Sequence, residues 1–324
     1  MIQRRTLLAA ALVPPVLAPP ALAQSGPPRI GWLTAQRPAS LAPFIPALRA
    51  GLAERNLVEG RDIALDFRFG EDDPARVPAL LDELLGLKVR VLLVQGVAAA
   101  GVIRARPPVP VVFVMSSGPV AAGLAESLAR PPAGVTGITF LSAALNGKRV
   151  ELLHELRPGL SRLAVLSNPA HPGEALERAE AGAAAARLGM AARFHHARNA
   201  AELEAAFAAM AADDAEALVV FPDGLALQNR AAIAAFATRR RIPLVSGWRA
   251  FAEAGALLSY GPRLEDSYRR LAHFVARILR GARPEDMPIE QPRVFELVVN
   301  QRSADAIGLA LPTALLARAD LVLD

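Results

Sequence analysis

From Arg29 onward, short apolar runs alternate with longer stretches in which apolar residues recur every three or four positions. A continuous run such as Ile30–Leu33 is typical of a buried strand, whereas Phe44, Leu48 and Leu52 share one side of a helix. In the first half the pattern predicts strands at 30–33, 63–69, 91–94, 109–114 and 135–139 and helices at 41–57, 78–87, 97–105 and 121–129. Strands separated by helices pair in parallel, so this half is predicted to be a parallel sheet covered on both faces.

The same order of elements then begins again. The pattern predicts strands at 163–166, 192–195, 217–221 and 244–245 and helices at 174–188, 202–210 and 225–239. A helix at 147–156, stopped by Pro158-Gly159, separates the two halves. The economical interpretation is an α/β protein with two doubly wound, Rossmann-like domains built on parallel sheets.

The last part of the chain is too short for a third domain. It predicts a strand at 256–259, a helix at 265–280, a strand at 295–299 and short helices to the end. These elements must dock onto the two existing sheets, so we expect several chain crossings that together form a hinge. The predicted N-terminal lobe comprises residues 29–142 and 261–283, and the predicted C-terminal lobe comprises residues 143–260 and 290–324.

Met1–Ala23 has the pattern of an export signal, with a short basic start, an apolar run from Leu7 and a small-residue cleavage site, Ala21-Leu22-Ala23. Four prolines break the apolar run, and it is shorter than the roughly 20 residues that span a bilayer, which disfavours a permanent anchor. Cleavage is predicted after Ala23. The pair Arg4-Arg5 fits either the general secretory or the twin-arginine route, and the sequence does not choose between them.

The 324 residues include 0 cysteines, which excludes disulfides, thiolate nucleophiles, iron–sulfur ligation and a lipid-modified N-terminal cysteine. The mature protein is therefore expected to be unanchored and periplasmic. Its formal net charge falls from +5 to +3 when the two arginines of the signal are removed. Arginine is interleaved with Asp and Glu along the chain, so we expect no nucleic-acid partner, and we expect a monomer.

Polar and glycine residues follow the predicted strands, where ligands bind in open parallel sheets. Such loops offer hydroxyl, amide and backbone N–H groups that suit a small polar ligand, although the same residue types also cap helices. The candidate ligand-binding residues are Thr34, Gln36, Gln95, Gly96, Ser116, Ser117, Ser167, Asn168, Asp223, Trp248 and Tyr260.

Three of these candidates have a specific chemistry. Asp223 ends the apolar strand 217–221 and is expected either to pair with a ligand ammonium or to cap the next helix. Trp248 lies at the same edge and Tyr260 near a predicted crossing, so each ring is expected either to stack on an aromatic ligand or to pack against the hinge. Trp32, inside a strand, is expected in the core.

No catalytic constellation is recognisable in the sequence. It contains no G-x-S-x-G around a serine, no H-E-x-x-H and no G-x-x-x-x-G-K-[ST] phosphate loop. His195-His196 falls at a strand end, but no further ligands at a fitting spacing accompany the pair. Arg239–Arg241 closes a helix, where positive charge complements the helix dipole. We therefore expect a protein that is not an enzyme and uses no metal and no cofactor.

Gly118–Leu124, Ser127–Pro131 and Val135–Gly137 together resemble a motif of a family of ABC-transporter substrate-binding proteins. Lys148 to Pro158, Ala164–Leu166, Asn168-Pro169 and scattered positions from Asn300 to Asp320 agree with the same family, so the resemblance covers nearly all of the mature chain. The sequence departs from the family pattern at two places. The family's Asp before Pro-Val is Gly118 here, and its Pro-Gly-Gly-Asn is Pro131–Gly134.

The resemblance implies a type I periplasmic binding protein fold, in which two domains close around a small ligand. It implies a periplasmic solute-binding component that delivers its ligand to an ABC permease in the inner membrane. Some members of the family are associated with aromatic amino acids, and Asp223 matches a recurrent family acid. The expected ligand is small and polar or amino-acid-like, with an aromatic one included; the departures leave its identity open.

Two other function classes fit the same architecture. A periplasmic sensing module that passes its ligand-bound state to a receptor kinase is the alternative, because sequence alone does not separate sensing from transport. A hydrolase would need a nucleophile with a base, and no such pair is visible in the sequence.

Overall fold

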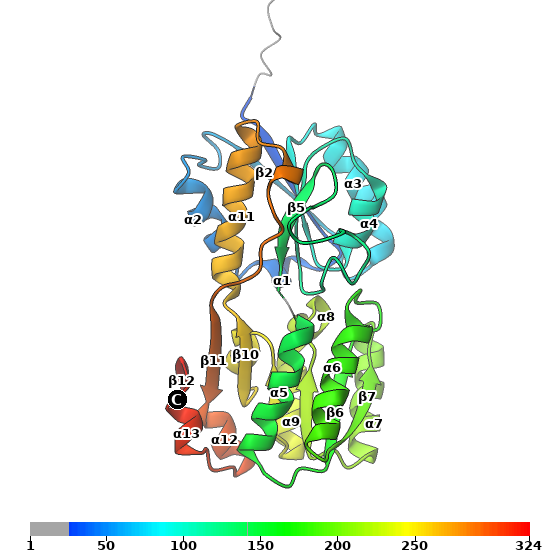
Figure 1. Ribbon diagram of the computed structural model, residues 1–324, viewed down its shortest axis with the longest axis vertical. Coiled ribbons are helices and arrows are strands. Elements are labelled where there is room, and N and C mark those ends of the chain that lie inside the picture. Colours follow the sequence, from blue (N-terminus) through cyan, green and yellow to red (C-terminus); the bar gives the residue numbers. More distant parts are fainter. Residues whose placement is uncertain (1–25, 141) are drawn as a thin grey trace, which may run out of the picture.

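The computed structural model describes residues 26–140 and 142–324, which form two lobes that lie one above the other (Figure 1). The predicted export signal, residues 1–23, lies outside the described residues. Across the described part of the chain, no helix has both the length and the apolar character that crossing a membrane requires.

The first lobe is a parallel five-stranded sheet with the order β2-β1-β3-β4-β5. Its strands are β1 (Arg29–Thr34), β2 (Ala64–Phe69), β3 (Val91–Gln95), β4 (Val111–Met115) and β5 (Val135–Thr139). Its helices are α1 (Pro38–Leu41), α2 (Ile45–Ala53), η1 (Pro74–Arg76), α3 (Val77–Gly86), α4 (Ala98–Ala105), α11 (Leu264–Leu279) and η2 (Pro284–Asp286).

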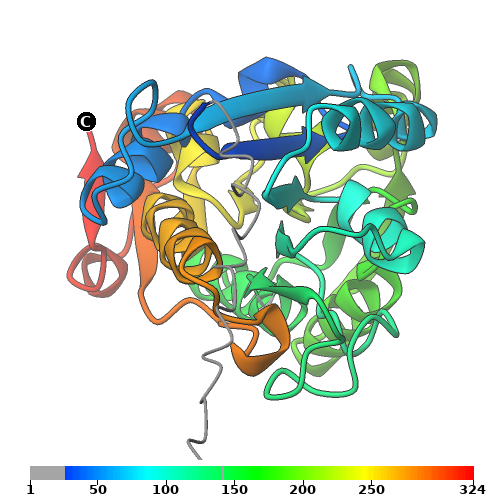
Figure 2. The same ribbon diagram turned by 90° about the horizontal axis from the view of Figure 1, so that it is seen from above.

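Both faces of this sheet are buried. Successive side chains of a strand point to opposite faces, so Ile30 and Trp32 pack with the core next to α2 and α11, whereas Leu33 packs with the core next to α3 and α4. Figure 2 shows these two pairs of helices on opposite sides of the strands. The burial explains why β4 is apolar throughout and β3 is apolar up to its last residue, Gln95.

The second lobe is a seven-stranded sheet with the order β12-β11-β10-β9-β8-β6-β7. Its strands are β6 (Arg162–Ser167), β7 (Ala191–His196), β8 (Ala217–Val220), β9 (Leu244–Ser246), β10 (Leu258–Pro262), β11 (Phe295–Asn300) and β12 (Leu321–Leu323). Its helices are α5 (Ser142–Leu156), α6 (Glu174–Arg187), α7 (Ala200–Ala212), α8 (Gly224–Gln228), α9 (Arg230–Arg240), α10 (Arg249–Glu253), α12 (Gln301–Ile307) and α13 (Thr313–Leu316).

Two strands of this sheet, β11 and β12, run in the opposite direction to the other five. β11 pairs antiparallel with β10, while the other neighbouring strands pair in parallel. β10 leads the chain out of the second lobe and β11 leads it back, so the two strands necessarily run in opposite directions. The chain then ends in β12, where the sequence pattern predicted short helices only.

The chain passes between the lobes three times: between Phe140 and Ser142, at Arg263, and over 291–294. The predicted boundary assigned Glu290 to the second lobe, but this residue lies in the first. Its amide donates to the Gly137 carbonyl at 2.9 Å, and its carboxylate pairs with Arg270 of α11 at 2.7 Å. The sequence pattern missed these contacts because they join residues distant in sequence.

Two predicted helices are interrupted by local chemistry. Of the helix predicted at 41–57, only Ile45–Ala53 forms, as α2. It is separate from α1, which ends at Leu41, because Pro43 and Pro46 lack the amide hydrogen that a continuous helix needs. The helix predicted at 225–239 is divided at Asn229 into α8 and α9.

The helix predicted at 121–129 is wrong. Residues 119–123 form turns, and Gly123 has a φ of 65°, the left-handed conformation that ends a right-handed helical path. Leu124 is buried but Val120 is 44% exposed, so the segment attaches to the lobe through single side chains rather than through a helical face.

Helix α11 shows how the distant part of the chain completes the first lobe. In α2, the position of Gly51 is so close to α11 that a Cβ atom there would lie 2.3 Å from the Arg269 carbonyl oxygen. The close approach lets Leu48 and Leu52 of α2 join Leu271 and Val275 of α11 in one buried cluster. The helix pair therefore depends on a glycine at position 51.

We expect Gly51→Ala to destabilise the protein by about 1–3 kcal/mol, because the added methyl group pushes backbone against backbone. Gly101→Ala is the matched control: Gly101 lies inside α4 with open space around it, so alanine there is expected to stabilise the helix by about 0.5–1 kcal/mol. Urea unfolding of both variants measures the two changes. Equal effects at the two positions would contradict the close packing of α2 on α11.

Candidate functional site between the lobes

A cavity lies between the lobes at the carboxyl ends of their strands. It is lined by Gln36, Phe44, Gln95, Gly96, Val97, Val114, Met115, Ser116, Phe140, His171, Asp223, Gly224, Leu227, Trp248, Leu264 and Tyr268. Its free volume is only about 30 Å³, because the lobes are closed on each other. Beside the cavity, Gln228 Nε2 donates to Asp72 Oδ1 at 2.7 Å and so joins the second lobe to the first.

Aromatic rings form much of the cavity wall. Phe44 and Tyr268 are stacked with their ring centroids 4.6 Å apart, and Phe140 meets Trp248 edge to face at 6.3 Å. Burial raises the pKa of the Tyr268 hydroxyl, so this ring stays neutral. Among the described residues, the buried indole Nε1 of Trp248 has no hydrogen-bond partner. The wall therefore suits a flat apolar group and keeps a donor available.

Asp223 is the acidic residue of the cavity wall. One carboxylate oxygen accepts from the Ala226 amide at 2.7 Å and so caps α8, and the other accepts from Asn168 Nδ2 at 2.7 Å. Burial raises the pKa of Asp223, although these two hydrogen bonds and the nearby His171 act in the opposite direction. A cation placed against this carboxylate would compensate for its burial, so the site favours a positively charged group.

Two glutamine side chains extend from the first lobe into the cavity. Gln95 Nε2 donates to Gln36 Oε1 at 3.1 Å, and the buried Oε1 of Gln95 has no partner among the described residues. The Gln36 side chain lies against Gly224 at the start of α8, where a Cβ atom would fall 1.1 Å from Gln36 Nε2. The missing side chain at position 224 thus lets the first lobe approach the second.

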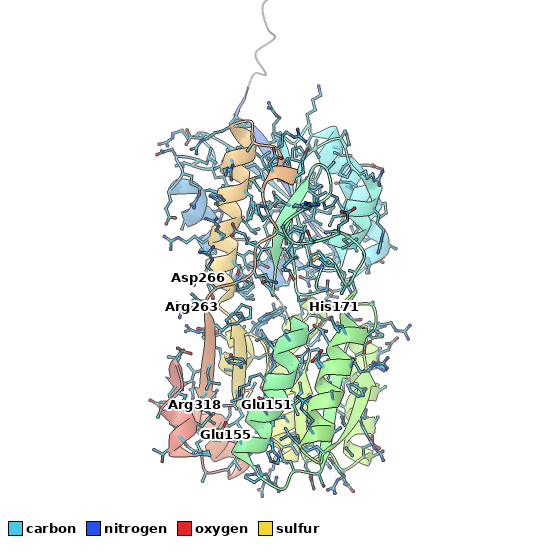
Figure 3. All side chains as sticks on the ribbon, viewed as in Figure 1. Glu151, Glu155, His171, Arg263, Asp266 and Arg318 are labelled. Carbon is cyan, nitrogen blue, oxygen red and sulfur yellow. The ribbon has the colours of Figure 1, made fainter. Side chains whose placement is uncertain are left out.

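His171 belongs to the second lobe and reaches the first. Its Nε2 lies 2.7 Å from Ser116 Oγ, and its Nδ1 lies 3.5 Å from Glu177 Oε2. Burial by itself lowers the pKa of His171, but the hydrogen bond and the charge of Glu177, together with Asp223 and Glu174, raise it above the ordinary value. Figure 3 places His171 at the boundary between the lobes.

The structure brings six of the sequence-predicted residues together in the cavity: Gln36, Gln95, Gly96, Ser116, Asp223 and Trp248. Asn168 does not line the cavity, but its side-chain amide donates a hydrogen bond to Asp223, which does. The remaining four do not line the cavity. Thr34 Oγ1 accepts from the Gln36 amide, the Ser117 carbonyl accepts from Thr139, Ser167 contacts Glu174 and His196, and Tyr260 packs in the core of the second lobe.

The two departures from the family motif, Gly118 and Pro131–Gly134, also lie outside the cavity lining. Sequence reasoning missed His171, because histidines were considered only for metal binding and catalysis. It also missed Phe44, Phe140, Tyr268 and Leu264, whose apolar periodicity is the same as that of core residues. For His171 a signal did exist, since it lies in the loop that follows Asn168-Pro169.

The chain matches the family model described as ABC transporter substrate binding protein over residues 39–323. It is 20% identical over 260 residues to a tyrosine-binding protein of Clostridioides difficile, with 80% of this chain and 74% of that protein covered. It is also similar to two solved structures, each covering 92% of this chain and all of the other. One is a conserved domain protein from Vibrio cholerae (23% identity, TM-score 0.85), and one is an ABC domain from Streptococcus pneumoniae in complex with L-Trp (22% identity, TM-score 0.84).

Two doubly wound lobes with a cavity between them define a two-lobed binding protein of the type I periplasmic fold, as the sequence resemblance implied. The match over residues 39–323 makes the chain a member of the ABC transporter substrate binding protein family. Members of this family are solute-binding proteins rather than enzymes.

The contact of Gln36 with Gly224 leads to a prediction about closure. Gly224→Ala is expected to displace the Gln36 side chain and shift the lobes toward an open arrangement, which small-angle X-ray scattering measures as a larger radius of gyration. The unfolding free energy should change by less than about 1 kcal/mol, because alanine is a better helix former than glycine. Combining the change with Gln36→Ala removes the clash and should restore closure. If Gly224→Ala alone is as compact as the parent protein, the absence of a side chain at position 224 is not what allows the lobes to close.

Proposed function

We propose that this protein is the exported solute-binding component of an ABC transporter and captures a small amino-acid-like ligand with an aromatic side chain. The observation that carries the proposal is the cavity between the lobes, which is lined by aromatic rings from both lobes and by one buried carboxylate, Asp223. This combination suits a ligand with an ammonium group at one end and a ring at the other.

The ammonium group and the ring of such a ligand each have a partner in the cavity. The ammonium group pairs with Asp223, whose raised pKa reflects the cost of burying its charge. The buried Gln95 Oε1 accepts a further N–H, and the ring contacts Phe44, Phe140 and Tyr268. The relatives support this choice, because one is named a tyrosine-binding protein and another was solved with L-Trp.

The small size of the cavity implies that the lobes open to admit a ligand and close around it. A free volume of about 30 Å³ is far below the roughly 300 Å³ of the smallest usual small-molecule pockets, so an amino acid enters only after the lobes separate and side chains move. The ligand then stabilises a closed form that touches it from both lobes, which shifts the population toward closure. A permease that recognises both lobes together distinguishes the loaded protein from the empty one.

Isothermal titration calorimetry with L-tryptophan, L-tyrosine and L-phenylalanine tests the ligand class, and Asp223→Asn tests the role of the carboxylate. Asparagine caps a helix as well as aspartate does, so the variant removes the charge and keeps the cap of α8. We expect its affinity for the amino acids to fall by at least about 30-fold, since one partner of a buried charge pair is lost.

Indole-3-propionate, which lacks the ammonium group, is the matched control ligand and should bind the parent protein and Asp223→Asn about equally. Equal affinity of an aromatic amino acid for the two proteins would remove Asp223 from ligand recognition. No binding of any of the three amino acids would contradict the proposed ligand class. Stimulation of the cognate permease's ATPase by the loaded protein separates transport from a role as a sensor for a kinase.

Export predicts a defined mature end. When the full chain is produced in a bacterium with an outer membrane, protein recovered from the periplasm should begin at Gln24 and contain 301 residues, 324 minus 23. Intact-mass spectrometry of the periplasmic fraction measures this, with the cytoplasmic fraction as the control. Full-length protein confined to the cytoplasm would contradict the export signal.

A further inference from the structure

A buried hydrogen bond joins the two lobes at the cavity, and the proposed ligand contacts do not use it. Ser116 follows β4 in the first lobe and His171 precedes α6 in the second, and each is 6% exposed. Ser116 Oγ lies 2.7 Å from His171 Nε2. The contact exists only while the lobes are closed, because its two partners belong to different sheets.

The groups that face His171 are mostly acidic. Glu174 and Glu177 come from α6 and Asp223 from the start of α8, and all three are less than 9% exposed. The fully buried guanidinium of Arg149, on α5, is the buried cation that acts on Glu177, and burial lowers its pKa to about 10. From the first lobe, the cavity receives hydroxyl, amide and apolar groups but no charged side chain.

This arrangement leaves negative charge in excess. Three buried carboxylates face one buried guanidinium, and the buried Glu177 Oε1 has no hydrogen-bond partner among the described residues. Two solvent-accessible groups, Arg178 at 3.9 Å and His196 at 3.8 Å, approach Glu174. His171 Nδ1 lies between the Gly173 amide, which donates to it at 3.3 Å, and Glu177 Oε2 at 3.5 Å. A proton on Nδ1 reduces the charge excess, replaces the Gly173 hydrogen bond by one to the Glu177 carboxylate, and leaves Nε2 as a charged donor toward Ser116. Hydrogen bonds from a charged donor are roughly twice as strong as neutral ones.

We propose that His171 is a proton-dependent latch between the lobes: its imidazolium, held by Glu177, donates to Ser116 and favours the closed form. In the neutral ring Nδ1 accepts from the Gly173 amide and Nε2 still donates to the Ser116 hydroxyl, so loss of the proton weakens the latch without removing it. The inference rests on the proposed function in one respect: it takes closure of the lobes as the motion that encloses the ligand.

The direction of the pH dependence follows from the closed structure. There the attraction of Glu177, Asp223 and Glu174 outweighs burial and raises the pKa of His171. Opening admits water, which screens these charges and moves the pKa back toward its ordinary value. Closure therefore takes up a proton: the extra stability of the closed form is present below the pKa of the open form and is lost as pH rises through the pKa of the closed form.

The experiment measures closure without ligand, so its result does not depend on the ligand class. The chain contains 0 cysteines, so Val120→Cys in the first lobe and Leu176→Cys in the second introduce the only thiols for spin labels. Both side chains are 44% exposed, and they follow Ser116 and His171 along the chain. Double electron–electron resonance at pH 5.5 to 8.5 then measures the distances between the two spin labels, and the distance distribution gives the ratio of closed to open protein.

We expect the closed-to-open ratio to fall as pH rises. The total fall is about tenfold for each unit by which the pKa of His171 in the closed form exceeds that in the open form. His171→Gln keeps a neutral donor for Ser116 and should remove most of this slope. Ser116→Ala should lower the ratio at every pH and flatten the slope. His273→Gln, which removes an imidazole from α11 of the first lobe outside the cavity lining, should behave as the parent protein does.

An unchanged slope in His171→Gln would overturn the proposal, as would a ratio that rises with pH in the parent protein. If His171→Gln does not fold, NMR titration of the assigned His171 ring in the parent protein decides: a pKa above 6.5 supports the latch, and a lower one contradicts it. Ligand calorimetry is a separate measurement, so a protein that binds none of the tested amino acids can still show, or fail to show, the latch.

Discussion

Two backbone segments of the second lobe approach each other so closely beside the hinge that neither has room for a side chain. A Cβ atom on Gly261 would lie 1.8 Å from the carbonyl oxygen of Gly247, and one on Gly247 would lie 2.5 Å from a guanidinium nitrogen of Arg149. Arg149 is fully buried, and its Nε donates to the Tyr260 carbonyl at 2.9 Å. This contact holds the end of β9, the outgoing strand β10 and helix α5 together. Because α5 and β10 adjoin two of the three crossings, it sets the frame in which the strand ends of the two lobes face each other.

The two lobes contribute different chemistry to the cavity between them. The first lobe supplies two amides, a hydroxyl and aromatic rings, whereas the charged groups, Asp223 and His171, come from the second. Closure covers these charges with a neutral surface and excludes water, which strengthens their interactions with a ligand and with each other. The proposed recognition of an ammonium group and the proposed control of closure by a proton therefore depend on the same buried acidic cluster, formed by Glu174, Glu177 and Asp223.

Apolar periodicity was sufficient to predict most of the strands and long helices, because burial on both faces of a sheet requires continuous apolar runs such as β3 and β4. It was insufficient where a single residue decided the local path, as with Gly123 in the turns after β4 and Pro43 before α2. For the site, the rule that ligands bind beyond strand ends selected Gln95, Asp223 and Trp248, which line the cavity between the lobes. The same rule also selected Thr34 and Ser167, since it does not tell which way a side chain at a strand end points.

The sequence by itself determined the doubled α/β order, the polar loops at the strand ends and, through its motif, the family. These features are local: each depends on a few neighbouring residues and on the periodicity of one element. Only the tertiary structure decided that α11 packs on α2 at Gly51, that β11 runs antiparallel to β10, and that His171 meets Ser116 across the cavity. These three contacts join residues far apart in the chain, and their geometry is set by how the two lobes pack, which no local pattern encodes.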